Sequence, residues 1–108
     1  MKKFSDILAS LESAEHIQKL ELFNADGSDA GEIENKPGSA GSVRVYHHLW
    51  KKWGSINTEA AKEGLELYAE HTDDAAENPG KHANIDRLFG VIANNAPLTV
   101  SVVRQTLH

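Results

Sequence analysis

Hydrophobic residues recur at intervals of three and four positions in two stretches of the chain, and each stretch predicts an amphipathic helix. The clearer series consists of Ile85, Leu88, Phe89 and Ile92. The other series lies near the first residues and consists of Phe4, Ile7, Leu8 and Leu11. This spacing lines the side chains along one face of an α-helix, and that face needs another layer to bury it.

A longer helix is predicted to run from Thr58 toward Pro79. Asn57 or Thr58 can cap its start, and Pro79 with Gly80 prevents its continuation into the helix at 85–92. Two adjacent stripes of small and hydrophobic residues indicate that this helix packs on two sides. One stripe consists of Ala61, Leu65 and Tyr68, and the other of Ala60, Gly64 and Leu67.

Alternation of hydrophobic and polar residues predicts three strands. In residues 17–23 leucines alternate with polar neighbours, and the turn-forming sequence of residues 24–27 follows. Residues 31–35 would form the weaker return strand of a hairpin, and residues 98–103 show the cleanest alternation. Because a lone hairpin is marginally stable in water, we expect the last strand to join the first two.

The stretch 43–53 fits two structures. Its first four residues alternate and are β-prone, whereas its large hydrophobic residues follow helical spacing. These large residues are Val43, Tyr46, Trp50 and Trp53. We favour a helix with Ser42 as its N-cap and Gly54 just beyond its end, and we expect this helix to bury both tryptophans.

The predicted elements follow the order α-β-β-α-α-α-β. This order is typical of an α+β fold, and we predict a small antiparallel or mixed three-stranded sheet covered on one face by about four helices. A chain of 108 residues is long enough for one hydrophobic core and too short for two ordinary domains. Residues 1–108 are therefore expected to form a single α+β domain.

Composition narrows the class of protein. No hydrophobic run approaches the roughly 20 residues of a membrane-spanning helix, and no signal segment follows the first lysines. The chain has no cysteine, which excludes disulfides and thiolate sites. We therefore predict a cytoplasmic protein without a membrane partner. The net charge of −5 makes nucleic acid an unlikely partner, because basic side chains supply most non-specific affinity for phosphates.

The best candidate for a binding site lies between Pro79 and the helix at 85–92. The expected N-cap of that helix is Asn84, and free backbone N–H groups with the positive end of the helix dipole favour an anion there. Lys81 and His82 would add positive charge. The candidate ligand-binding residues are Lys81, His82, Asn84 and His71.

Imidazoles and carboxylates in the same region could also bind a divalent metal or transfer protons. The residues concerned are His71, Asp73, Asp74, His82 and Asp86. Their spacing matches no metal motif, and helix ends normally carry polar caps, so we expect neither a metal nor a cofactor. The chain contains no Gly-x-Ser-x-Gly elbow, and its sequence identifies no catalytic residue.

Two other stretches receive structural interpretations. Residues 38–42 lack the Gly-Lys-Ser/Thr ending of a phosphate-binding loop and are interpreted as a flexible loop. The helix that follows carries basic residues on its expected outer face, and such a face usually contacts solvent. These basic residues are Arg44, His47, His48, Lys51 and Lys52.

Four segments together suggest a family. They are 64–72 (GLELYAEHT), 79–88 (PGKHANIDRL), 33–38 (IENKPG) and 13–17 (SAEHI). With these segments the chain resembles, over nearly its whole length, a family of small bacterial proteins classed only as a domain of unknown function. The resemblance implies a bacterial, cytoplasmic origin and assigns no catalytic residue.

The sequence favours a small non-enzymatic binding or protein-interaction module, because no catalytic group of residues is present and the size leaves little room for a deep pocket. The alternative is a small enzyme or sensor for an anionic small molecule bound near residues 79–86. A protein partner is one possibility, and a homodimer that pairs the last strand is another, since a three-stranded sheet has two free edges. Whether the chain is an enzyme stays open at this point.

Overall fold

The computed structural model describes residues 3–105 of the chain. The helices in this part are α1 (Phe4–Ser10), α2 (Ala40–Trp53), α3 (Thr58–Leu67), α4 (Glu70–Glu77) and α5 (Ala83–Asn94). The strands are β1 (Ile17–Phe23), β2 (Asp29–Glu34) and β3 (Thr99–Arg104). The predicted α+β class and order of elements are confirmed, with the long central helix divided into α3 and α4.

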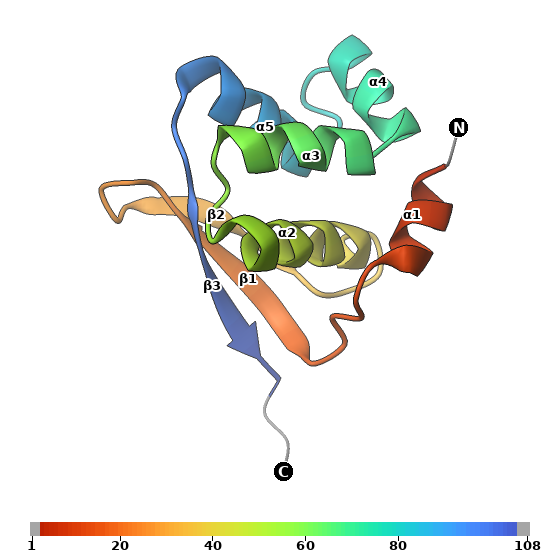
Figure 1. The fold of residues 1–108 in the computed structure, drawn as a ribbon, viewed down its shortest axis with the longest axis horizontal. Coiled ribbons are helices and arrows are strands. Elements are labelled where there is room, and N and C mark those ends of the chain that lie inside the picture. The colour runs from red at the N-terminus through yellow and green to blue at the C-terminus, as the bar shows by residue number, and fades with distance from the viewer. Residues whose placement is uncertain (1–2, 106–108) are drawn as a thin grey trace.

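The sheet has the order β2-β1-β3, and β1 pairs antiparallel with both neighbours. Leu20 pairs with Ile33 on one side and with Val102 on the other, so three hydrophobic side chains cross the same face of the sheet. Leu20 and Ile33 are buried there beneath the helices, all of which lie on one side of the sheet (Figure 1). The predicted pairing of the last strand with the hairpin is confirmed.

Helix α2 forms a middle layer between the sheet and the other central helices (Figure 1). It contacts β1 and β2 on one side and α3 on the other. Its buried residues are therefore not confined to one stripe and include Val43, Val45, Tyr46, His47 and Leu49. Burial on more than one side explains why the sequence also looks β-prone, and the helical interpretation of this stretch is confirmed.

The sequence predicts the end of α2 correctly and its start incorrectly. Gly54 ends the helix with φ of 83°, a left-handed conformation that glycine adopts without strain, as expected. The start is three residues earlier than the predicted cap suggests, because Ser39 precedes the first helical residue, Ala40. Ser42 lies inside the first turn, and the prediction that it caps the helix is wrong.

The prediction that α2 buries both tryptophans is also wrong. Trp50 is half-buried, and Trp53 is 38% exposed. Trp53 is the last residue of the helix, and its indole N–H lies 3.3 Å from a carboxylate oxygen of Glu63 on α3. The indole thus lies at the polar surface between two helices instead of in the core.

The boundary between α3 and α4 lies at Ala69, which adopts φ of 52° and ψ of −120°. This conformation turns the chain out of α3, and the Thr72 hydroxyl donates a hydrogen bond to the Leu65 carbonyl across the turn. At its other end, α3 is capped by Asn57, whose side chain accepts a hydrogen bond from the Ala60 N–H at 2.8 Å. The predicted cap at Asn57 is confirmed.

Helix α5 begins two residues earlier than its predicted cap implies. His82 occupies the N-cap position, and Asn84 lies in the first turn, so the prediction that Asn84 caps the helix is wrong. The Asn84 side-chain oxygen instead accepts a hydrogen bond from Arg87 at 2.8 Å. Asp86 is in the first turn as expected, and its carboxylate accepts the Gly80 N–H at 2.9 Å.

None of the helices within residues 3–105 has the length and hydrophobicity to cross a membrane.

Candidate functional site

A cavity of about 470 Å³ lies where the starts of α2 and α5 meet α1 and α4; we call it the α2–α5 cavity. All four candidate ligand-binding residues line it, namely His71, Lys81, His82 and Asn84. They come from α4, from the connection after it, and from the start of α5. The remaining lining residues are Phe4, Leu8, Gly38, Ala40, Gly41, Ser42, Tyr68, Ala83 and Ile85.

Two helix starts contribute backbone donors to the cavity wall. Within residues 3–105, the N–H groups of Gly41 and Ser42 on α2 have no hydrogen-bond acceptor, and neither do those of Ala83 and Asn84 on α5. The first N–H groups of a helix lack intrahelical partners, and the helix dipole places partial positive charge at the same end. Both helices therefore present positive potential to one space.

The basic side chains of the cavity are organised by Asp74 on α4. One carboxylate oxygen of Asp74 lies 2.6 Å from His82 Nε2 and 3.1 Å from Lys81 Nζ. The hydrogen bonds from His82 and then Lys81 lower the pKa of Asp74 to about 2. The carboxylate thus stays ionised and holds the Lys81 ammonium and the His82 imidazole at the rim of the cavity.

The imidazole of His71 lies beside this cluster and has no hydrogen-bond partner among the described residues. Its ring centroid is 5.8 Å from that of His82. The rings of His71 and Phe4 are nearly perpendicular, with centroids 5.1 Å apart. An imidazole nitrogen without a protein partner can donate to or accept from a ligand. The two histidines are therefore close enough to contact one small molecule.

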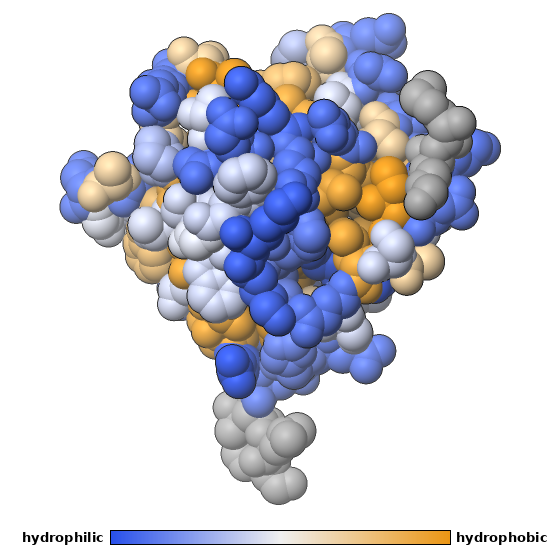
Figure 2. Space-filling model, viewed as in Figure 1, coloured by the Kyte–Doolittle hydropathy of each residue, from blue (hydrophilic) through white to orange (hydrophobic). Residues whose placement is uncertain are grey.

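The hydrophobic part of the cavity wall comes largely from α1. Phe4 stacks on Tyr68 with ring centroids 5.3 Å apart, and the Phe4 N–H donates to Glu70 at 2.8 Å. Leu8 lies one helical turn further and packs, like Phe4, against the core. Hydrophobic residues are visible next to α1 on the face shown in Figure 2. The cavity is thus lined by both basic and hydrophobic side chains.

Buried tyrosines fix the walls relative to one another. The Tyr68 hydroxyl donates to Ser42 Oγ at 2.7 Å and so ties the end of α3 to the start of α2. The Tyr46 hydroxyl donates to the Asn84 carbonyl at 2.5 Å and ties α2 to the start of α5. Burial raises the pKa of Tyr46 to about 12 and also raises the pKa of Tyr68. Both hydroxyls therefore remain protonated donors at neutral pH.

Sequence reasoning identified the half of the cavity formed by residues 71–84 and missed the other half. Residues 38–42 were interpreted as a flexible loop, but the α2 helix starts within them and contributes two of the free N–H groups. Phe4 and Leu8 were expected only to pack on the core. Their approach to the start of α2 is seen only in the structure, where a Cβ added at Gly41 would lie 3.2 Å from Leu8 and 3.3 Å from Phe4.

The arrangement favours hydrogen bonding over metal coordination. Within residues 3–105, no three His, Asp or Glu side chains lie close enough together to hold a metal ion. Among the hydroxyl groups that line the cavity, Ser42 Oγ accepts from Tyr68 and has no imidazole as a partner. Amide, imidazole and ammonium donors that converge on one cavity are suited to the oxygens of an anion.

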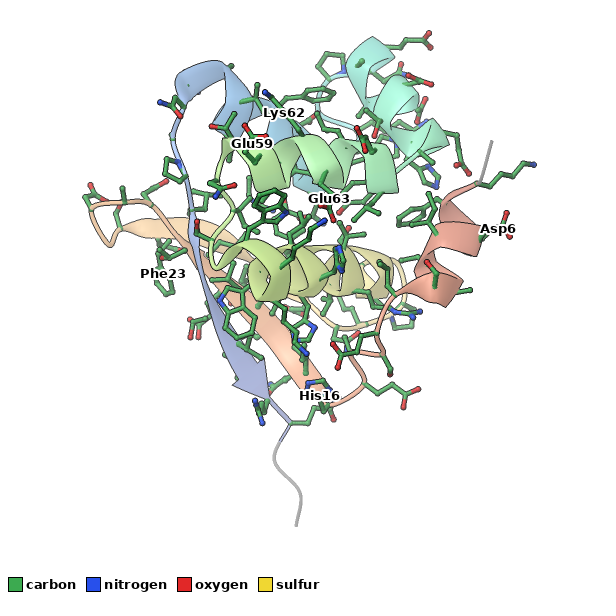
Figure 3. All side chains as sticks on the ribbon, in the orientation of Figure 1. Asp6, His16, Phe23, Glu59, Lys62 and Glu63 are labelled. Atoms are coloured by element: carbon green, nitrogen blue, oxygen red, sulfur yellow. The ribbon has the colours of Figure 1, made fainter. Side chains whose placement is uncertain are left out.

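The basic residues of α2 lie on a different surface and are largely paired with acids. Lys51 lies 2.8 Å from Glu12, while Lys52 and His48 each lie 2.6 Å from Glu63, which projects from α3 toward α2 (Figure 3). His47 was expected on the outer face of the helix but is only 5% exposed. That expectation is wrong, because the His47 ring packs between the rings of His16 and Trp50.

Comparison with known proteins identifies a family and nothing more specific. Residues 4–102 match the family described as "Uncharacterized protein conserved in bacteria (DUF2322)". Searches of curated proteins and of solved structures gave no match. The match to the family spans nearly all of the chain and confirms the resemblance noted from its segments. The chain therefore belongs to this family of uncharacterised bacterial proteins.

Proposed function

We propose that this protein is a small binding module that holds an anionic small molecule in the α2–α5 cavity. The observation that carries the proposal is the convergence of two helix starts and three basic side chains, His71, Lys81 and His82, on one cavity. Its volume of about 470 Å³ falls within the range of small-molecule sites. The proposal places this activity in the cytoplasm, as the sequence predicts.

Local charge supports an anion in spite of the net charge of −5. Asp74, the carboxylate that contacts Lys81 and His82, is already bonded to both of them, and the nearby carboxylates of Glu70 and Asp86 accept backbone N–H groups. An anion in the cavity would add charge-assisted hydrogen bonds to these groups, to His71 and to the free amides, and such bonds are stronger than neutral ones. The side chains and amides that line the cavity are therefore sufficient to bind an anion.

Titration with inorganic phosphate tests the proposal. A ligand at a tenfold excess over its dissociation constant adds about 1.4 kcal/mol to the free energy of unfolding, which raises the melting temperature of a domain of this size by roughly 6 °C. Calorimetry of the same mixture gives the dissociation constant directly. If neither inorganic phosphate nor an organic anion bound by calorimetry or shifted the melting temperature, the proposal would be overturned.

Two variants locate the binding site and a third serves as the control. His71→Gln and Lys81→Met each remove a basic group at the cavity, and we expect each to weaken phosphate binding at least fivefold. His48→Gln removes an imidazole that lies 2.6 Å from Glu63, outside the cavity lining, and should leave binding unchanged. Equal weakening by all three variants would show that phosphate binds by general charge attraction.

Self-association through β3 is a second proposal, on a separate observation. Within residues 3–105, β3 pairs on one side with β1 and has no partner strand on the other, and Val100 and Val102 are only half-buried. Pairing of two β3 strands would satisfy the open edge and cover these valines. Light scattering at high micromolar concentration should then give the mass of a dimer, and a strict monomer would contradict the proposal.

A further inference from the structure

The hydrophobic side of the α2–α5 cavity carries an inference about which anion it holds. We propose that the ligand is an amphiphilic phosphate monoester, with its phosphate against His71, Lys81 and His82 and a hydrophobic body against Phe4 and Leu8. This inference rests on the proposed function, since it assumes that the cavity binds an anion. It adds the chemical class of the ligand and a role for α1.

The volume of the cavity exceeds the needs of a small inorganic anion. At about 470 Å³ the cavity is many times larger than the roughly 30 Å³ that one water molecule occupies in the liquid. An inorganic phosphate ion occupies a minor part of such a space. A ligand that fills the cavity therefore carries a body considerably larger than its acidic group.

Basic and hydrophobic side chains reach the cavity from different elements. The basic side chains lie on α4 and at the start of α5, whereas Phe4 and Leu8 project from α1. Phe4 and Leu8 are half-buried, so part of their hydrophobic surface is still exposed. Hydrophobic surface that a ligand removes from water contributes free energy in proportion to its area. The hydrophobic wall thus selects a ligand with a hydrophobic body over a fully polar one.

The donors around the cavity favour a phosphate over a carboxylate as the acidic group of the ligand. Hydrogen-bond donors reach the cavity from four places: the first turn of α2, the first turn of α5, the His71 ring and the Lys81 and His82 pair. A phosphate monoester presents three terminal oxygens that accept several bonds each, whereas a carboxylate presents two. A set of donors on several sides is better matched to the phosphate group.

Helix α1 is positioned to serve as the wall for the hydrophobic body. It has no buried residue, and its attachment to the cavity includes the Phe4 N–H bond to Glu70 and the stacking of Phe4 on Tyr68. Gly41 allows this approach, since a Cβ there would lie 3.3 Å from the Phe4 ring. Substitutions in α1 therefore change the hydrophobic wall without removing a basic group.

Calorimetric titration with inorganic phosphate, phenyl phosphate and benzoate tests the inference. We expect phenyl phosphate to bind at least tenfold more tightly than inorganic phosphate, a difference of about 1.4 kcal/mol. Benzoate should bind more weakly than phenyl phosphate. Phe4→Ala and Leu8→Ala should each reduce the preference for phenyl phosphate at least threefold while inorganic phosphate binds as before. Leu11→Ala, at the end of α1 and outside the cavity lining, is the matched control and should retain the preference.

The outcomes separate the two proposals. Tight binding of inorganic phosphate without a preference for phenyl phosphate overturns the inference and leaves the proposed function standing. Binding of benzoate as tight as that of phenyl phosphate also overturns it, as does an equal loss of preference in Leu11→Ala. No binding of any of the three anions overturns both proposals. Circular dichroism checks that each variant is folded, and Phe4→Leu replaces Phe4→Ala if the latter unfolds.

Discussion

Gly64 lies where α3 passes closest to its neighbours, and its replacement by alanine gives the sharpest test of the packing. An added Cβ would lie 2.7 Å from Leu88 Cδ1 on α5 and 2.9 Å from Leu49 Cδ1 on α2. Carbon atoms in favourable contact are roughly 3.5–4.0 Å apart. Both leucines are completely buried, so any shift that relieves the contact must take place within the core.

Two opposing effects determine the stability of Gly64→Ala. Alanine in a helix interior is favoured over glycine by about 1 kcal/mol, whereas overpacking of a core costs about 1–3 kcal/mol. We expect the strain to exceed the gain and the free energy of unfolding to fall by about 1 kcal/mol. Gly90→Ala is the matched control, because Gly90 lies inside α5 and an added Cβ there meets no atom within 4 Å. It should raise the free energy of unfolding by about 0.5–1 kcal/mol.

Urea denaturation followed by circular dichroism measures both variants. The expected gap between them is about 2 kcal/mol, which corresponds to roughly 1 M in the urea midpoint for a slope of about 2 kcal/mol per M. The slope itself should not change, since neither substitution alters the extent of unfolding. If Gly64→Ala proved as stable as Gly90→Ala, the close approach of α3 to Leu49 and Leu88 would be refuted.

Three further predictions concern a cap, a strained turn and a buried imidazole. Asn57→Ala removes the acceptor of the Ala60 N–H and should lower the free energy of unfolding by about 1 kcal/mol in urea titrations. Ala69→Gly should raise the free energy of unfolding by about 1 kcal/mol, since φ of 52° with ψ of −120° is strained for alanine and accessible to glycine. A lower urea midpoint for this variant would contradict the strained conformation at Ala69. Burial lowers the pKa of His47 below its ordinary 6.5, so the unfolded chain binds the proton more readily and stability should fall as pH decreases through 6.5. Urea midpoints at several pH values should show this fall, and His47→Leu should reduce it.

Local patterns in the sequence were sufficient for most of the secondary structure. The alternation in residues 98–103 and the spacing of Ile85, Leu88 and Ile92 depend on neighbours along the chain, and both elements formed as predicted. The break at Ala69 was missed because the segment contains neither glycine nor proline at that point. The turn there depends on the bond from Thr72 to Leu65 and on packing, which no local pattern records.

The candidate site shows the same division between local and long-range information. Lys81 and His82 could be selected because charge before a helix start is visible in sequence. Their meeting with Ser42 and Phe4 could not, since these residues are brought together only when α2 and α1 pack against the start of α5. The tyrosine hydroxyls that join these helices looked like ordinary core residues in the sequence.

The central position of β1 has a consequence for how the molecule forms during synthesis. A nascent polypeptide translated as far as Asn94 already contains β1, β2 and every helix, but the strand that must lie along the second edge of β1 has not yet been made. Until then, an unpaired backbone edge beside Leu20 and Leu22 is open to other polypeptides. β1 and β3 lie near opposite ends of the described chain, and pairing of segments so far apart in sequence is slow. The ribosome-bound intermediate is therefore the species that we expect chaperones to protect.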